Sequence, residues 1–243
     1  MEKAMKRALV TGGSGDIGAA ICRRLAVEGV EVLVHANRNL ARAEAVCAEI
    51  VAAGGRARAV VFDVADTEQC RAILAAEAER SPIQIVVNNA GVHDDAPLAG
   101  MSERQWRHVI DVSLHGFYNV TQPLLLPMMA TRWGRIISLS SIAGVMGNRG
   151  QANYAAAKAG LHGASKSLAL ELASRGVTVN VVAPGIIAGR MTDQVFDKDA
   201  IKNLVPMKRA GQPEEVAALV AFLASEHAAY ISGQIIGING AMA

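Results

Sequence analysis

The sequence predicts one α/β domain built on a doubly wound, parallel sheet of about seven strands with helices on both faces. Short, nearly continuous apolar runs rich in β-branched residues alternate with helix-like segments along most of the 243 residues. Parallel strands that are covered on both faces are apolar along their whole length. Strict alternation of strands and helices produces right-handed crossovers. We find no internal repeat, low-complexity tract or linker, so we expect residues 1–243 to form a single domain.

Each expected strand combines β-branched residues with an almost unbroken apolar run. In chain order the strands are Ala8–Thr11, Val30–His35, Arg58–Asp63, Ile83–Asn88, Arg135–Ser140, Thr178–Ala183 and Gln234–Ile238. Helical periodicity places helices between them, at Ile17–Glu28, Leu40–Ala53, Thr67–Arg80, Ser102–Ala130, Gln151–Ser174 and Pro213–Ala224. The stretch 186–211 breaks the alternation, and we expect it to form a flap over the substrate before the last helix.

Composition excludes several classes of protein. Apolar residues make up 51% and charged residues 19% of the chain, which is typical of a well-packed globular protein. The formal net charge of +2 gives no support for nucleic-acid binding. No run of about 20 apolar residues predicts a membrane span, and the N-terminus lacks the apolar core of a signal peptide. Cys22, Cys47 and Cys70 have no paired spacing. We therefore expect a cytoplasmic protein with reduced thiols and no metal site.

A glycine-rich loop follows the first expected strand, with the sequence Thr11-Gly-Gly-Ser-Gly-Asp-Ile-Gly18, and a helix follows the loop. Glycines let the backbone turn sharply and approach a pyrophosphate, whose charge is met by the N-terminus of the helix. Such a loop alone is often only a tight turn. Its position after the first strand of an alternating pattern favours a Rossmann-type dinucleotide site, with Gly12, Ser14 and Ile17 nearest the cofactor.

The residues after the second strand favour NADP(H) over NAD(H). An acidic residue there would bind the ribose 2′-hydroxyl, whereas an arginine can accept a 2′-phosphate. The chain has His35-Ala-Asn-Arg38, with no acid in reach; the alternative is that Arg38 is a solvated surface charge. Asp63 could reach the adenine amino group or cap the next turn. Asn88-Asn-Ala-Gly91 ends the fourth strand with small residues that bring the backbone against the nucleotide.

Tyr154 and Lys158 stand four residues apart in a segment of strong helix formers, so they share one face of a helix. A fixed cation favours the phenolate, and we therefore expect the pKa of Tyr154 to fall toward neutral pH. A tyrosine with such a pKa can act as a general acid or base. The spacing by itself is common in ordinary helices, so its meaning depends on the rest of the chain.

Together these motifs resemble the classical short-chain dehydrogenases/reductases over essentially the whole chain. The glycine loop, Asn88-Asn-Ala-Gly91, Ser141, Tyr154-x-x-x-Lys158 and Pro184-Gly185 occur in the order and spacing of that family. Within the family, three segments are most similar to the 3-oxoacyl-[acyl-carrier-protein] reductases. They are Met146–Gly160, Arg175–Gly185 and Met207–Val216.

The resemblance implies a role for each matched residue. Tyr154 would protonate the forming alkoxide, Lys158 would hold the nicotinamide ribose and keep the Tyr154 pKa low, and Ser141 would orient the carbonyl. The residues expected to bind NADP(H) are Gly12, Ser14, Asp16, Ile17, Gly18, Asn37, Arg38, Asp63, Val64, Asn89, Ala90, Gly91, Tyr154, Lys158, Pro184, Gly185 and Ile187.

Three residues depart from the family pattern. Asp16 stands where the glycine loop usually has a second glycine, and an acid beside a pyrophosphate repels it unless the side chain turns away. Ser113 replaces an asparagine that holds a water in a proton relay behind the lysine. Gly189 replaces a threonine that binds the nicotinamide carboxamide. These departures put cofactor affinity and turnover in question, but not the class of reaction.

The resemblance also implies a substrate and partners. We expect NADPH-dependent reduction of a 3-oxoacyl thioester in fatty-acid or polyketide-like biosynthesis. Arg132 and Arg175 would dock an acidic acyl carrier protein beside the active-site mouth, or they are ordinary solvated arginines. The apolar helices and the C-terminal strand would assemble a D₂ homotetramer. One alternative is a reductase of acetoacetyl-CoA or another small ketone, and another is a nucleotide sensor without turnover.

Overall fold

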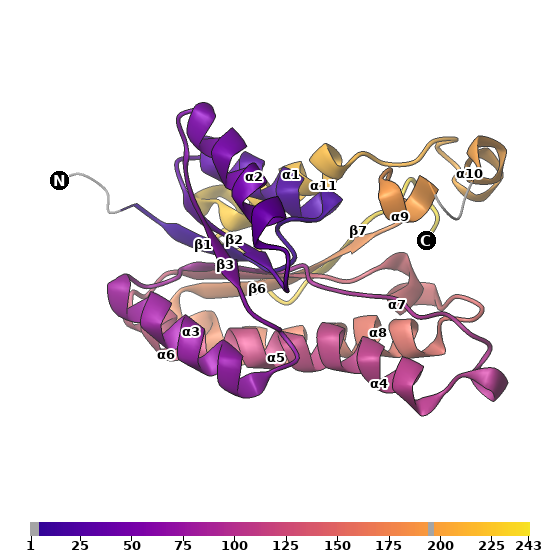
Figure 1. The fold of residues 1–243 in the computed structure, drawn as a ribbon, viewed down its shortest axis with the longest axis horizontal. Coiled ribbons are helices and arrows are strands. Elements are labelled where there is room, and N and C mark those ends of the chain that lie inside the picture. Colours follow the sequence, from indigo (N-terminus) through magenta and orange to yellow (C-terminus); the bar gives the residue numbers. More distant parts are fainter. Residues whose placement is uncertain (1–4, 194–196) are drawn as a thin grey trace.

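The strands of the computed structural model form a seven-stranded, all-parallel sheet in the order β3-β2-β1-β4-β5-β6-β7 (Figure 1). The structure describes residues 5–193 and 197–243. The strands are β1 (Arg7–Val10), β2 (Glu31–Ala36), β3 (Arg56–Val61), β4 (Ile85–Asn88), β5 (Gly134–Leu139), β6 (Val177–Pro184) and β7 (Ile235–Ile238). The doubly wound α/β fold predicted from the alternation is confirmed.

The central strands are buried because helices cover both faces of the sheet. Every residue of β1, β4, β5 and β6 is buried, as their continuous apolar runs predicted. From β1 the chain winds outward to β2 and β3, then returns past β1 to β4 and continues the other way. The strand order therefore reverses between β1 and β4. In open α/β sheets the binding crevice lies at the carboxyl ends of the strands at such a point.

Two groups of helices enclose the sheet, one on each face (Figure 1). The first group comprises α1 (Asp16–Val27), α2 (Leu40–Ala52) and α11 (Pro213–Ala224). The second comprises α3 (Thr67–Arg80), α4 (Glu103–Ile110), α5 (Gly116–Thr121), α6 (Leu125–Ala130) and α8 (Ala152–Leu172). Each group packs its apolar stripe on its own side of the sheet, and two hydrophobic cores result.

The single helix expected over 102–130 is interrupted twice. A capping box of Ser102 and Gln105 precedes α4, close to the expected start of the helix. After α4 the backbone forms a π-helix, η2 (Asp111–His115), and before α6 it forms a short 3₁₀ turn, η3 (Gln122–Leu124). Pro123 lies within η3, where its missing N–H breaks the α-helical hydrogen-bond ladder.

Three short helices near the carboxyl edge of the sheet are absent from the sequence prediction. They are α7 (Ile142–Met146), α9 (Arg190–Asp193) and α10 (Lys198–Leu204). The last two belong to the expected flap, of which residues 194–196 lie outside the described residues. The ends of this segment are joined, because the Ala188 N–H donates to Gly211 O (2.8 Å) and the Gly211 N–H donates to Ile186 O (2.9 Å). Single 3₁₀ turns complete the described elements: η1 (Leu98–Gly100), η4 (Ala173–Arg175) and η5 (Glu226–Ala228).

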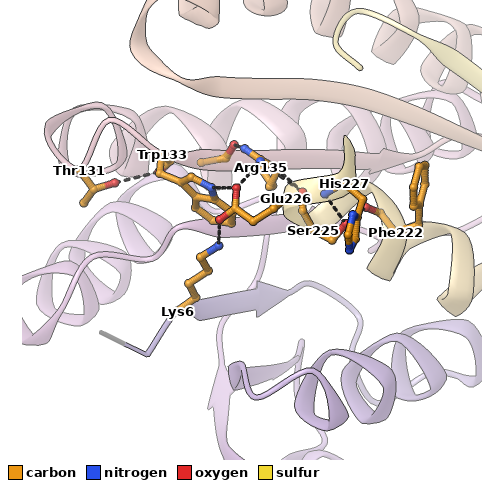
Figure 2. Close-up of polar contacts among 9 residues, drawn as sticks. Lys6, Thr131, Trp133, Arg135, Phe222, Ser225, Glu226 and His227 are labelled. Atoms are coloured by element: carbon orange, nitrogen blue, oxygen red, sulfur yellow. Dashed lines mark hydrogen bonds and ion pairs between the residues drawn. The ribbon is translucent and has the colours of Figure 1, made fainter. Parts of the chain in front are cut away.

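At the amino edge of the sheet, a cluster of polar contacts joins distant parts of the chain (Figure 2). The Trp133 ring lies between the Lys6 ammonium, 3.3 Å from its centroid, and the Arg135 guanidinium, 4.3 Å from it. Glu226 accepts hydrogen bonds from Lys6 Nζ (2.8 Å) and Trp133 Nε1 (3.1 Å). Arg135 is only 2% exposed and donates to Ser225 O, so it is a structural residue.

The remaining sequence expectations concern membranes and thiols. Within residues 5–193 and 197–243, no helix is long and apolar enough to cross a membrane. Cys22, Cys47 and Cys70 are buried and free of disulfide bonds. Burial raises the pKa of Cys70 to about 12, so this thiol is protonated and unreactive at neutral pH.

Candidate active site

A cavity of about 410 Å³ lies at the carboxyl edge of the sheet, where the strand order reverses. Its size is within the range of small-molecule and cofactor sites. The wall combines the glycine loop after β1, the residues after β2, β4, β5 and β6, and the start of α8. The predicted site residues that line it are Gly12, Ser14, Asp16, Ile17, Gly18, Asn37, Asn89, Ala90, Gly91, Ser141, Tyr154, Lys158, Pro184, Gly185 and Ile187.

The glycine loop is held against the end of β4 by hydrogen bonds. Thr11 Oγ1 accepts from the backbone N–H groups of Asn89 and Ala90, both at 2.9 Å. The side-chain amide of Asn89 donates to Thr11 O at 2.8 Å. A Cβ on Gly18 would collide with the carbonyl oxygen of Gly12, so α1 can pack this close to the loop only with glycine there. The loop and the end of β4 therefore form one joined surface.

His35, for which the sequence indicated no role, supports the same loop from β2. Its Nδ1 accepts a hydrogen bond from the Gly12 N–H (3.0 Å), and its Nε2 donates to Phe62 O (2.8 Å). This pattern requires the neutral ring. Burial lowers the pKa of His35 to about 4, which keeps the ring neutral at physiological pH. The available signal in the sequence was a histidine within the otherwise apolar second strand.

Ser141, Tyr154 and Lys158 line the same cavity. Ser141 follows β5 and caps α7, where its Oγ accepts from the Ala143 N–H (3.1 Å). Its side chain also forms a hydrogen bond with that of Tyr154. On α8, Nζ of Lys158 lies 5.6 Å from the centroid of the Tyr154 ring and donates to Leu139 O at 2.8 Å.

The electrostatics of this triad differ from the sequence expectation. Burial raises the pKa of Tyr154, and the opposing effect of the Ser141 hydrogen bond is smaller. Burial lowers the pKa of Lys158 to about 8. The expected fall in the Tyr154 pKa is therefore wrong for the polypeptide in this arrangement, because desolvation of the phenol outweighs its neighbours. At neutral pH most of the Lys158 side chains are still protonated.

Buried polar side chains fix the start of α8 in place. Asn153 is fully buried, and its side-chain amide donates to Asp94 O (3.0 Å) and Gln105 O (3.1 Å). Ser140 Oγ donates to Lys158 O (3.0 Å) and also bonds Nε2 of His162 (2.7 Å). Ser140 is therefore a structural hydroxyl. These contacts hold Tyr154 and Lys158 relative to β5.

Ser113 lies behind Lys158, in the π-helix η2. A methyl group added to Gly91 would lie 3.0 Å from Nζ of Lys158 and 3.6 Å from Oγ of Ser113, so both atoms border the same small space. Oγ of Ser113 is buried and has no hydrogen-bond partner among the described residues. Buried hydroxyls without a protein partner are commonly satisfied by ordered water.

Asp16, the acid in the glycine loop, pairs with Arg190 in the segment 186–211. Its carboxylate accepts three hydrogen bonds from Arg190, at 2.9 Å from the backbone N–H, 3.1 Å from Nε and 3.0 Å from Nη2. Partial burial alone would raise the pKa of Asp16, but the bonds from Arg190 hold it below its usual value. Sequence reasoning missed Arg190, because the two residues are 174 positions apart.

Some of the predicted residues lie outside the cavity lining. Arg38 is exposed after β2, Asp63 Oδ1 accepts from the Ala65 N–H (2.9 Å), and Val64 packs against Gly116. Arg132 precedes β5, and Arg175 precedes β6, so both lie at the amino edge of the sheet. They are thus at the opposite edge from the cavity, which corrects the expectation that they flank its mouth on the same chain.

Comparison with known proteins shows the family of this chain. The profile of the short chain dehydrogenase family matches residues 6–200. The chain belongs to the short-chain dehydrogenase family. This membership confirms the resemblance seen in the sequence. Short-chain dehydrogenases are nicotinamide-dependent oxidoreductases, so the chain is an enzyme of that class.

Relatives within the short-chain dehydrogenase family match over nearly the full length. The 3-oxoacyl-[acyl-carrier-protein] reductase FabG of Staphylococcus aureus is 45% identical over 243 residues, covering 99% of each chain. The 3-oxoacyl-[acyl-carrier-protein] reductase of Synechocystis is 46% identical over 237 residues, covering 97% of this chain and 96% of the relative. Nodulation protein G of Azospirillum brasilense is 44% identical over 240 residues, covering 98% of both.

Proposed function

We propose that this short-chain dehydrogenase reduces the ketone of a 3-oxoacyl thioester to the 3-hydroxyacyl thioester, with NADPH as the reductant. The substrate is carried by an acyl carrier protein, and the reaction belongs to fatty-acid or polyketide-like biosynthesis. One observation carries the proposal: the chain matches enzymes named for this reaction along its whole length, and it brings Ser141, Tyr154 and Lys158 to one cavity.

The residues of the cavity fit a nicotinamide dinucleotide. The glycine loop and the N-terminus of α1 offer backbone N–H groups to a pyrophosphate. Glycine at positions 12 and 18 lets the loop pack this closely against Asn89 and α1. A side chain on Gly91 would approach Nζ of Lys158, so glycine keeps this part of the cavity open. The chain uses Tyr154 and Lys158 to hold the nicotinamide ribose.

Two guanidinium groups support NADPH over NADH. Arg38 follows β2 without any acid that would prefer a free 2′-hydroxyl. Arg42, in the first turn of α2, directs its Nη2 toward Ser14 O at 3.4 Å, and Ser14 lines the cavity. Arg42 was not singled out in the sequence. The Arg42 guanidinium therefore lies next to Ser14 and can bind a 2′-phosphate there.

The catalytic roles follow from acid–base chemistry. When bound, the cofactor supplies a hydride to the ketone carbon. Ser141 Oγ–H donates a hydrogen bond that orients the ketone oxygen, and the Tyr154 hydroxyl donates a proton to that oxygen as negative charge develops on it. The nearby Lys158 ammonium stabilises the phenolate that remains. A pKa of about 8 leaves this ammonium largely charged at neutral pH.

Ser113 takes part in returning a proton to Tyr154. Its buried, unpartnered Oγ borders the same space as Nζ of Lys158. A water held between the two would link the ammonium to solvent. The hydroxyl thus does the work of the asparagine that is usual at this position, with a shorter reach.

The carrier protein docks on Arg132 and Arg175, and the positions of these arginines require a partner subunit. Along α8, from Tyr154 to Arg175, a rise of 1.5 Å per residue gives a separation of roughly 30 Å. In a two-fold dimer with antiparallel α8 helices, the carboxyl end of one helix lies beside the amino end of the other. Each chain then offers its arginines to the cavity of its partner.

Exposed apolar side chains support the homotetramer. The helices on the α8 face carry Trp106, Tyr118, Leu126 and Leu170 at the surface, and large exposed apolar patches mark interaction sites. At the other end of the sheet, β7 is an edge strand, and Tyr230 just before it is fully exposed. Two such surfaces suffice for a D₂ tetramer.

The segment 186–211 acts as the substrate flap. Its first residues, Ile187 to Gly189, line the cavity, and the bonds between Ala188 and Gly211 join its ends. Its helices α9 and α10 extend beyond the carboxyl edge of the sheet (Figure 1). The flap is therefore placed to cover a substrate that enters beside Tyr154.

The direct test is a kinetic assay that follows loss of NADPH absorbance with 3-oxoacyl thioesters on a carrier protein and on coenzyme A. We expect turnover with both, and a higher kcat/KM on the carrier. Preference for acetoacetyl-CoA would indicate a reductase of small ketones. NADPH binding without turnover of any ketone would indicate a sensor. Parallel assays with NADH test the cofactor preference.

A further inference from the structure

An ion pair beside the cavity joins Asp16, which departs from the family pattern, to Arg190, which lies next to the departure at Gly189. Asp16 begins α1, on the pyrophosphate side, and Arg190 begins α9, in the flap. Both Asp16 and Gly189, the neighbour of Arg190, line the cavity. The three hydrogen bonds between Asp16 and Arg190 therefore join the two walls between which the cofactor lies.

Gly189 makes room for this ion pair. A Cβ on Gly189 would lie 2.7 Å from Oδ2 of Asp16, which is closer than such atoms approach. The residue also has φ of +148°, a conformation that favours glycine. The unusual acid at position 16 and the unusual glycine at position 189 are therefore two parts of one arrangement, because the carboxylate occupies the space of the missing side chain.

Backbone hydrogen bonds of the residues on either side of Arg190 hold this part of the flap together. The Thr192 N–H donates to Gly189 O at 3.0 Å, and the Ala188 N–H donates to Gly211 O at 2.8 Å. The strip 187–190 is thus held to the rest of the flap on one side and to α1 on the other. Any force that holds Arg190 at Asp16 also holds Ile187 and Ala188 against the cavity.

The pair also settles a conflict of charge. A carboxylate at the N-terminus of α1 would compete with the pyrophosphate for the same partial positive charge and repel it. Arg190 compensates that charge, because its guanidinium donates twice to Oδ1 of Asp16 and its backbone N–H donates to Oδ2. The Asp16–Arg190 pair as a whole is neutral toward the cofactor.

We propose that Asp16 and Arg190 are positioning residues for the cofactor, which fasten the flap strip 187–190 to the start of α1 and slow cofactor release. This proposal rests on the proposed function, because it presupposes a nicotinamide dinucleotide in the cavity. The threonine that is usual at position 189 would help to retain the cofactor by binding its carboxamide. In this chain the Asp16–Arg190 pair beside the cavity would help to retain the cofactor instead.

The test measures the rate of NADPH dissociation by stopped-flow fluorescence, without any ketone substrate. We expect Asp16→Asn and Arg190→Gln each to speed dissociation about 3-fold or more, from the loss of charge-assisted bonds. Arg190→Gln should have the larger effect because it leaves the carboxylate uncompensated. The double variant should resemble Asp16→Asn, since both act on one pair. Arg190→Lys should recover part of the wild-type rate.

A matched control is Arg209→Gln, which breaks an exposed bidentate pair with Glu215 at the far end of the same flap. Its dissociation rate should equal that of the wild type. An Asp16→Asn variant that releases NADPH at the wild-type rate or more slowly overturns the bridge alone, since the acid would then only repel the cofactor. A wild-type enzyme that does not bind NADPH overturns the proposed function and the bridge together.

Discussion

At the scale of single residues, the site depends on a phenol and an ammonium whose pKa values are both set chiefly by burial. Burial favours the neutral form of each, so Tyr154 remains a protonated acid while Lys158 titrates near 8. The pair is thus ready to donate a proton at neutral pH. The direction of reduction, in which the alkoxide must be protonated, suits a neutral phenol better than a phenolate.

Replacing Tyr154 tests this assignment. Tyr154→Phe keeps the ring and its packing on α8 but removes the proton donor. We expect kcat to fall by about 10²–10⁴-fold, the usual contribution of a general acid, with NADPH affinity nearly unchanged. Steady-state assays and fluorescence titration measure the two quantities. Activity close to that of the wild type would show that another group supplies the proton.

Replacing Ser113 tests the relay. Ser113→Ala removes a buried hydroxyl that has no hydrogen-bond partner among the described residues. We expect the free energy of unfolding to stay the same or rise by about 1 kcal/mol, while kcat falls by less than about 10²-fold. Chemical denaturation and steady-state kinetics separate the two effects. Unchanged kcat would exclude Ser113 from the relay, and Ser113→Asn, which restores an amide, serves as the comparison.

At the scale of elements, the long apolar strands and the glycine loop could be predicted from local sequence, whereas the breaks in helices could not. The segment Asp111–His115 carries no sequence mark of a π-helix, and α7, α9 and α10 are too short to show helical periodicity. Pro123 was a sequence signal for the second break, although the periodicity across it predicted one continuous helix. In the site, Ser141, Tyr154 and Lys158 followed from order and spacing. The partners of Asp16 and Gly12 did not, because they depend on contacts between distant segments.

Because His35 is buried in β2, we expect the free energy of unfolding to depend on pH. Its pKa is about 4 when folded and roughly 6.5 when unfolded, so between these values the unfolded chain binds a proton that the folded chain does not. Stability is therefore full above the unfolded pKa and falls as the pH drops through the folded one, by up to about 3 kcal/mol. Denaturant titrations across this range should show the loss. His35→Phe should flatten it, and an unaltered slope would contradict the role of His35.

At the scale of the whole molecule, the opposite edges of the sheet have different tasks. The carboxyl edge holds the cavity, and the amino edge holds the Trp133 cluster (Figure 2) and the proposed docking arginines, which precede β5 and β6. The proposed docking arginines lie at the edge of the sheet opposite the cavity of their own chain, so the proposed docking serves the cavity of a partner chain. The proposed delivery of substrate by the carrier therefore depends on assembly of the chains.

Mixed assemblies distinguish delivery within a chain from delivery between chains. Arg132→Glu/Arg175→Glu should raise KM for carrier-bound substrate and leave coenzyme A thioesters unaffected. Added salt should reduce the difference in KM for carrier-bound substrate between the wild type and this variant, because salt screens exposed charges. Co-assembly of that variant with Tyr154→Phe should restore carrier-dependent activity, since intact arginines on one chain serve the intact tyrosine on another. No restoration would contradict docking across the interface.

The state of assembly is a separate prediction. Sedimentation equilibrium should give the mass of four chains, and charge introduced at the α8 face by Leu170→Glu should reduce it to a dimer or monomer. The substitution lies on an exposed side chain, so the fold of each chain should survive, as circular dichroism can check. A wild-type monomer at micromolar concentration would refute the tetramer.

The π-helix η2 has a consequence for how this enzyme tolerates insertions and deletions. A π-turn contains one residue more than the α-helical turn that it replaces, and it is found mostly at functional sites. Deleting one residue from 111–115 would let the helix run on regularly with every core contact of α5 available. It would also rotate Ser113 by about 100° around the helix axis. Such a deletion variant should fold well, but the Ser113 hydroxyl should point away from Lys158. The length of the segment 111–115 therefore matters to the site as much as the identity of the residues in it.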